Sequence, residues 1–198
     1  MFAGITTLAA LIALFRAPWR QLLDQSARQH MFMLCTALLA LLWLGGIQVQ
    51  DNVTVHLLGL TPVVLIFGWE LALLSGYLAA LMLAFLGFWP WTALPVEVLL
   101  SVLVPVIITQ AWLWLADRLP RTNLFVYLLG VGFLGGVFSM LGALLLASHL
   151  QGWTLDHPLA LLLAFPEGFI SGAVVTALTV FAPSIMRTYD DVRYLGEE

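Results

Sequence analysis

The chain has 198 residues, of which 62% are hydrophobic and only 9% are charged, with a mean hydropathy of +1.03. Soluble domains carry about 25% charged residues, so this composition excludes an ordinary soluble protein. A net charge of −4 from so few ionisable groups also argues against nucleic acid as a partner. We therefore expect a single integral-membrane domain over residues 1–198, surrounded by a lipid bilayer.

Seven apolar segments follow one another along the chain. A helix needs about 20 residues to cross a membrane, and the first and third segments are shorter than this. Only Gly68 to Glu70 separate the third segment from the fourth, which favours a tight helical hairpin over one very long helix. The sequence thus predicts an all-α polytopic membrane protein with about seven transmembrane helices in one bundle. The expected spans are residues 2–15, 31–48, 53–68, 69–89, 96–116, 123–148 and 158–182.

The basic residues all fall on one side of this arrangement. Because arginine and lysine are enriched in cytoplasmic connections, the N-terminus is predicted to lie outside and the C-terminus in the cytoplasm. The stretch 16–30 is basic and amphipathic, which indicates an interfacial helix on the cytoplasmic side. The chain has no lysine, and its seven basic residues are Arg16, Arg20, Arg28, Arg118, Arg121, Arg187 and Arg193.

Small residues spaced four apart mark positions where helices can approach closely in lipid. The pairs in residues 132–139 and 168–176 indicate internal packing of the sixth and seventh segments. Ala9 and Ala13 form such a pair in the first segment. A short terminal helix tends to lie at the edge of a bundle, so a partner helix contact at Ala9 and Ala13 is a rival to internal packing.

Placing an ionisable or amide side chain inside a membrane costs free energy, so such residues are functional candidates. Glu167 lies several residues into the seventh segment, directly after Pro166, and Gln110 lies within the fifth. Pro166 leaves a backbone carbonyl without its usual donor. The Glu167 carboxyl group is therefore expected either to cap the freed helix turn, to accept a hydrogen bond from Gln110 or Thr109, or to take part in transport.

His56 opens the third segment at the predicted outer face. Asp51, Glu97, His149 and His157 share that face. Imidazole and carboxylate groups suit borderline divalent metal ions such as Co²⁺ and Ni²⁺, so these side chains are candidate metal ligands. No local spacing such as HxH joins them, and for His149 and His157 a role as solvated loop residues is favoured.

Several kinds of chemistry have no support in the sequence. Without lysine the chain has neither a P-loop nor a Schiff-base residue, and the zinc-protease signature HExxH is absent. We therefore expect a protein that is not an enzyme and has no intrinsic cofactor. Active transport would take its energy from a partner or from an ion gradient.

Three stretches together carry a family resemblance. They are VHLLGLTPVVLIFGWELALLSGYLAALM at 55–82, the AFPEGFISG of the seventh segment and the closing MRTYDDVRYL, and they span about residues 53–195. The chain resembles the CbiM-like permeases of energy-coupling factor ABC transporters, most closely the proteobacterial branch. The resemblance implies a seven-helix subunit of the bacterial inner membrane that captures a transition metal ion, usually cobalt or nickel, as its substrate. It also implies a companion transmembrane coupling subunit and ATPase subunits.

The resemblance further implies which groups bind the metal ion. His56 matches the family histidine that follows a polar loop. Family members begin Met-His, and their ligands include the terminal amine, the first amides and the histidine at this second position. The present chain begins with Met1 and Phe2. The Met1 amine remains an expected ligand, and we expect weaker or different metal selectivity. The alternative is a non-transporting membrane assembly or scaffold factor that has lost the N-terminal metal site.

Overall fold

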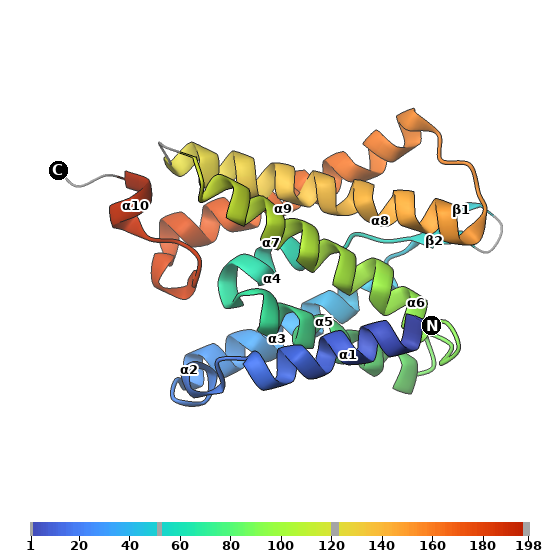
Figure 1. Ribbon diagram of the computed structural model, residues 1–198, viewed down its shortest axis with the longest axis horizontal. Helices are drawn as coiled ribbons and strands as arrows, with labels where there is room; N and C mark the ends of the chain where they lie inside the picture. Colours follow the sequence, from blue (N-terminus) through green and yellow to red (C-terminus); the bar gives the residue numbers. More distant parts are fainter. Residues whose placement is uncertain (1, 51–52, 120–122, 196–198) are drawn as a thin grey trace.

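A computed structural model describes residues 2–50, 53–119 and 123–195 and shows long helices running roughly along one direction (Figure 1). Within these residues, four helices are long and apolar enough to cross a membrane, and two apolar helices are shorter. The prediction of an all-α, multi-pass membrane protein is confirmed. The four long helices are α3 (Ser26–Leu44), the stretch Leu94–Ala116, the stretch Val126–Gln151 and α9 (His157–Phe181). The second of these contains α6 (Leu94–Val98) and α7 (Val104–Ala116), and the third ends in α8 (Gly135–Gln151). The shorter helices are α1 (Phe2–Arg16) and α5 (Trp69–Phe85).

The outer surface of the bundle is apolar, as a bilayer requires. Large side chains on different helices point away from the protein, with Phe15 84%, Phe85 76% and Phe181 87% exposed. A soluble protein rarely exposes so many large apolar groups on contiguous helix faces. Contact with lipid accounts for this surface, and the chain is therefore built to lie in a membrane.

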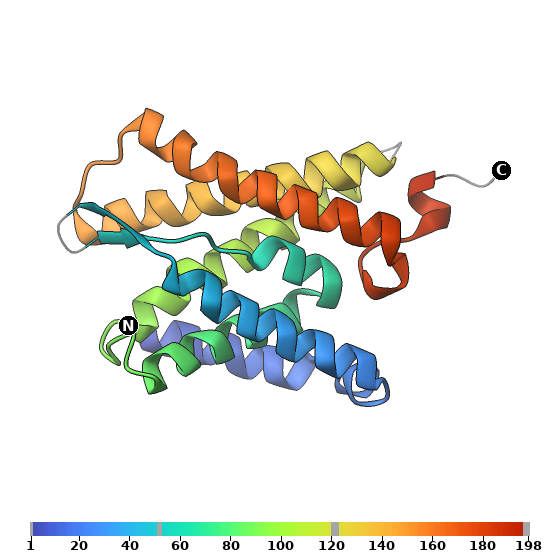
Figure 2. The same cartoon turned by 180° about the vertical axis from the view of Figure 1, so that it is seen from behind.

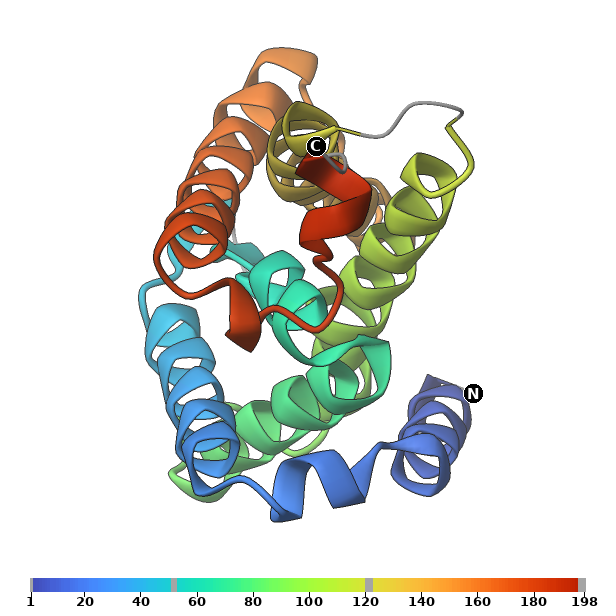
Figure 3. The ribbon, with the colours of Figure 1, turned by 90° about the vertical axis from the view of Figure 1, so that its left-hand side faces the viewer.

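The third apolar segment, residues 53–68, is not the transmembrane helix that was predicted. It begins in a two-stranded antiparallel hairpin, β1 (Ile47–Gln50) and β2 (Val53–Val55), and only α4 (Leu60–Phe67) is helical. The extended chain between β2 and α4 crosses part of the molecule (Figure 2). All residues of α4 are buried, and the other helices surround it in the end-on view of Figure 3. Because neighbouring helices shield it from lipid, this segment can leave the helical conformation.

The two ends of the bundle differ in character (Figure 1). The hairpin, α6, the start of α1 and the α8–α9 connection gather at one end, the hairpin end. The opposite end, the arginine end, carries α2 (Trp19–Leu23), the junction of α4 and α5, η3 (Pro183–Ile185) and α10 (Asp191–Leu195). One interfacial helix was predicted over 16–30, but this stretch contains two separate helical pieces. They are α2 and the first turn of α3.

At the arginine end, three of the described arginines bind residues of other elements. Arg28 donates to the carbonyl of Ile185, Arg187 pairs with Glu70 at 3.3 Å, and Arg193 pairs with Asp117 at 3.1 Å. These contacts join the start of α3, the start of α5, the end of α7 and the C-terminal segment. The separation of arginines from the hairpin end is thus a property of the fold, and Arg121 lies outside the described residues.

The C-terminal segment closes the end of α4. The last carbonyl groups of a helix lack partners within it. Here the amide of Arg187 donates to Ile66 at 3.0 Å, the amide of Thr188 donates to Leu65 at 3.2 Å, and the Arg187 guanidinium donates to Phe67 at 2.8 Å. The carbonyl groups of Leu65, Ile66 and Phe67 at the end of this buried helix therefore have hydrogen-bond donors.

Small residues serve internal packing. A Cβ atom added at Gly168 would lie 2.8 Å from the carbonyl oxygen of Phe133, and one at Gly136 would lie 3.0 Å from the Cα of Gly168. The predicted internal packing of these segments is confirmed. The partner helix contact expected at Ala9 and Ala13 is wrong for Ala13, which is fully buried within the chain, while Ala9 is half-buried. The reason is that α1 packs the face that carries Thr6 and Ala13 against the bundle, mainly against α5.

Candidate functional site

His56 has one ring nitrogen free to accept a hydrogen bond or bind a cation. Its Nδ1 atom lies 3.0 Å from the carbonyl oxygen of Leu57, and its Nε2 atom lies 3.3 Å from the Ser101 hydroxyl. A carbonyl only accepts, so Nδ1 carries the proton and Nε2 keeps its lone pair. Metal-binding histidines usually donate their other N–H to a carbonyl or carboxylate in this way.

Two tryptophans hold the imidazole ring. The rings of Trp43 and Trp89 stack with their centroids 5.5 Å apart, and their centroids lie 5.6 and 5.8 Å from that of His56. The indole of Trp43 also donates to the carbonyl of Leu58 at 3.0 Å. His56 lies before α4, outside the helical spans. Its enclosure by these groups lowers the pKa of the imidazole, which favours the neutral form that a metal ion requires.

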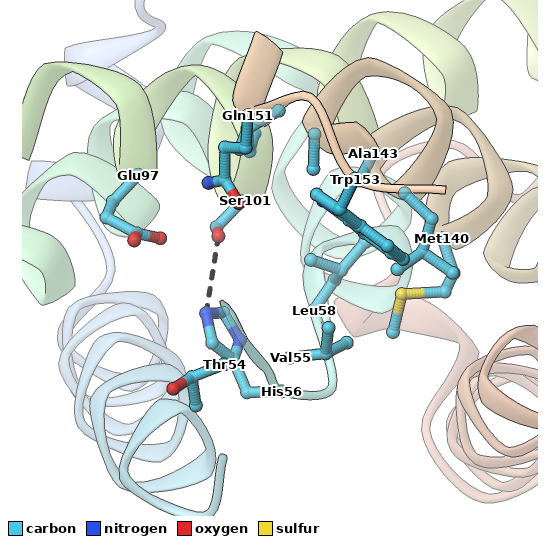
Figure 4. A pocket seen from close by; sticks show the side chains of 13 residues that line it. Thr54, Val55, His56, Leu58, Glu97, Ser101, Met140, Ala143, Gln151 and Trp153 are labelled. Atoms are coloured by element: carbon cyan, nitrogen blue, oxygen red, sulfur yellow. Dashed lines mark hydrogen bonds between the residues drawn. The ribbon is translucent and has the colours of Figure 1, made fainter. Parts of the chain in front are cut away.

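A small cavity of about 50 Å³ opens beside His56 at the hairpin end. In Figure 4, Glu97 lies on one side of the hydrogen bond between His56 and Ser101, and Trp153 and Met140 lie on the other. A cavity of this size can hold one ion or a water molecule or two. The polar side chains that line it are Thr54, His56, Glu97, Ser101, Gln151 and Trp153.

Ser101 reaches His56 from an unusual stretch of helix. Residues Leu99–Leu103 (η1) form a wide π-helical turn between α6 and α7. Pro105 has no N–H to donate to the carbonyl of Ser101 four residues earlier, which accounts for a local widening. Such turns often occur at functional sites, and this one places the Ser101 hydroxyl at the cavity.

The structure brings together only part of the ligand set predicted from the sequence. His56 and Glu97 line the same cavity. His149 and His157 do not line it and are exposed, because they lie at the end of α8 and the start of α9 where those helices project to solvent. Met1 and Asp51 lie outside the described residues. Within the described parts of the chain, no group of three or more His, Cys, Asp or Glu side chains forms a metal cluster.

Four polar groups at the cavity were not predicted. They carry no motif and come from separate parts of the chain: Thr54, Ser101, Gln151 and Trp153. Trp153 is buried, and its indole N–H has no hydrogen-bond partner among the described residues. The one available signal was a Trp in the predicted outer connection between the sixth and seventh apolar segments.

Glu167 caps a helix, but a different one from the helix expected. Its two carboxylate oxygens accept the backbone N–H groups of Leu58 at 2.7 Å and Gly59 at 2.9 Å, and the Ser171 hydroxyl donates to it at 3.3 Å. These amides stand at the start of α4. The carboxylate therefore stabilises the N-terminal end of α4 rather than the turn freed by Pro166.

Neither of the side chains predicted to contact Glu167 does so. Thr109 shares hydrogen bonds with Thr61 at 3.0 Å and with Ser139 at 3.2 Å. Gln110, the neighbouring residue on α7, lines a separate hollow with Trp69 and Trp114. Thr109 is thus directed toward α4 and α8, and Gln110 lies about 100° further around α7, so neither side chain reaches Glu167.

The bundle and its cavity define a multi-pass membrane protein with a small polar site at the hairpin end. Residues 1–185 match the family described as the cobalt uptake substrate-specific transmembrane region, CbiM. Because the match covers most of the chain, the protein belongs to this family of transporter components. No curated protein and no solved structure matches the chain.

Proposed function

We propose that this protein is the substrate-capture subunit of an energy-coupling factor transporter in the bacterial inner membrane and takes up a transition metal ion. The observation that carries the proposal is the His56 imidazole. Its Nε2 lone pair is oriented by the hydrogen bond from Nδ1 to Leu57, and the ring borders a cavity shared with Glu97. The cavity is lined by residues of β2, α6 and the α8–α9 connection, so it lies at the hairpin end, away from the arginine end.

The chemistry of the cavity suits a borderline divalent cation. Imidazole nitrogen is a preferred ligand of Co²⁺ and Ni²⁺, and a carboxylate such as that of Glu97 adds charge compensation. The Ser101 hydroxyl can reorient from the Nε2 atom when an ion takes that lone pair. The Met1 amine and water molecules would complete the coordination shell. Cobalt or nickel is thus the proposed substrate rather than a resident cofactor.

The energy for uptake would come from other subunits. The chain has no lysine and hence no P-loop, which is consistent with ATPase partners acting through a companion transmembrane subunit. Since Ala13 is buried, the companion subunit would meet the opposite, exposed face of α1. That face carries Ile5, Leu8, Ile12 and Phe15.

The decisive test is metal binding by the purified protein. We expect wild-type protein to bind Co²⁺ or Ni²⁺ in equilibrium dialysis, and His56→Ala to lose most of this binding, since the oriented imidazole is removed. His149→Ala is the matched control, because His149 is exposed and outside the cavity. Equal binding by wild type and His56→Ala would reject His56 as a ligand.

One observation favours a second candidate function. Among the residues that line the cavity, two are typical metal ligands, His56 and Glu97, and so small a set also suits a membrane assembly or scaffold factor that binds no metal ion. The same dialysis experiment separates the two functions. Absence of Co²⁺ and Ni²⁺ binding by the wild type, together with recovery of a stable complex with other membrane subunits, would support the scaffold function.

A further inference from the structure

Glu167 is connected to His56 through the backbone of residues 56–59, although it does not line the cavity. We propose that Glu167 is a positioning residue that fixes the His56 imidazole for metal capture. This inference rests on the proposed function, and it concerns a residue that does not itself touch the metal ion.

The connection consists of consecutive hydrogen bonds. Glu167 accepts the amides of Leu58 and Gly59 at 2.7 and 2.9 Å. The carbonyl of Leu58 accepts the Trp43 indole N–H at 3.0 Å, and the carbonyl of Leu57 accepts Nδ1–H of His56 at 3.0 Å. The segment between β2 and α4 is therefore held on both sides, by α9 through Glu167 and by α3 through Trp43.

The segment needs this support because it has no regular structure of its own. It follows β2, and Gly59 enters α4 with a φ of +67°, in the left-handed region. The amides of Leu58 and Gly59 point into the protein interior, where an unpaired N–H is expensive. The Glu167 carboxylate pairs with both, and its negative charge also suits the N-terminal end of a helix.

A carboxylate fits this position better than an amide. Each of its two oxygens accepts one backbone N–H. Glutamine has one acceptor oxygen, and its NH₂ group would face the second N–H, donor against donor. Glu167→Gln therefore preserves size and helix packing while it releases one of the two amides and loosens the segment that carries His56.

The test compares Glu167→Gln with a matched variant in α9. Thr179→Val removes a buried hydroxyl that has no hydrogen-bond partner among the described residues. Co²⁺ affinity is measured by dialysis and thermal unfolding is recorded for each. We expect Glu167→Gln to bind about tenfold more weakly, and Thr179→Val to bind like wild type at similar unfolding temperature.

A second measurement is made without metal. In ¹⁵N NMR spectra, the His56 ring signal, assigned by its loss in His56→Ala, should show the Nδ1–H tautomer in wild type. It should show mixed tautomers in Glu167→Gln. Hydrogen exchange of residues 56–60 should become faster in that variant and stay unchanged in Thr179→Val. A merely structural role for Glu167 would lower the unfolding temperature but leave the His56 tautomer unchanged.

The outcomes separate this inference from the proposed function. If wild type binds Co²⁺ through His56 and Glu167→Gln binds equally well with unchanged ring signals, the positioning role is wrong and metal capture stands. If wild type binds neither Co²⁺ nor Ni²⁺, metal capture fails, and so does any positioning role that serves it. A loss of affinity with a changed tautomer in a folded Glu167→Gln protein would support the inference.

Discussion

At the scale of single residues, the state of the His56 ring decides what the cavity can do. The carbonyl of Leu57 fixes the proton on Nδ1, and the stacked Trp43 and Trp89 rings restrict the imidazole plane. A histidine that rotated freely at a membrane surface would lose entropy on binding an ion. Here the ring is already oriented, so binding an ion costs less conformational entropy.

The pH dependence of metal binding follows from the pKa of His56. Protons compete with the metal ion for Nε2, so binding at a fixed, subsaturating Co²⁺ concentration should fall between pH 7.5 and 5.5. Because enclosure lowers the pKa of His56, the midpoint should lie below the ordinary histidine value of about 6.5. Dialysis across this range checks the expectation. A midpoint above 6.5, or the same profile in His56→Ala, would contradict it.

At the scale of elements, α4 is a short helix stabilised at both ends by distant parts of the chain. Glu167 satisfies the amides at its start, and Arg187 and Thr188 satisfy carbonyls at its end. Gly68 then turns the chain into α5 with a φ of +87° and a ψ of 166°, a conformation that is essentially restricted to glycine. The geometry of α4 thus depends on contacts that only the folded bundle provides.

Gly68→Ala should destabilise the protein. An alanine residue would have to adopt the backbone conformation of Gly68, which costs about 1–3 kcal/mol. Its Cβ atom would also overlap the Arg187 guanidinium beside Glu70. Thermal unfolding in detergent measures the effect. Gly4→Ala is the control, because an added Cβ at Gly4 meets open space in α1. Equal unfolding temperatures for the two variants would show that the turn at Gly68 tolerates a side chain.

At the scale of the whole molecule, the fold separates two kinds of surface. The arginine end contains the contacts of Arg28, Arg187 and Arg193, and the hairpin end contains the His56 cavity. By the positive-inside rule the arginine end should face the cytoplasm. An ion arriving from outside would then reach His56 without first crossing the bundle.

Cysteine labelling checks this orientation. In a Cys35→Ala background, Arg20→Cys should react with a membrane-impermeant reagent only after the cytoplasmic face is opened. Leu155→Cys, in the α8–α9 connection, should react in intact cells because it lies near the hairpin end. Labelling of both positions from the same side would disprove the orientation.

Part of the site was predictable because its signals are local. His56 and Glu97 were singled out by residue type and by the predicted face, and the structure places both at one cavity. Ser101 could not be predicted, because the wide turn over Leu99–Leu103 decides where its side chain points. Gln151 and Trp153 could not be predicted either, because the packing of the end of α8 and of the α8–α9 connection brings them to the cavity. For His149 and His157 the sequence favoured solvated positions over a role as metal ligands, and both are exposed away from the cavity.

The sequence by itself determined the environment and the overall architecture of this protein. Hydropathy gave a multi-pass helical bundle, because the transfer of apolar side chains into lipid depends on composition along the chain. The tertiary structure alone decided that residues 53–55 form a strand, that 56–59 have no regular structure, and that Glu167 caps α4 from 109 residues away. A buried amide must find a partner, but which carboxylate reaches it depends on how the helices pack, and no local pattern encodes that choice.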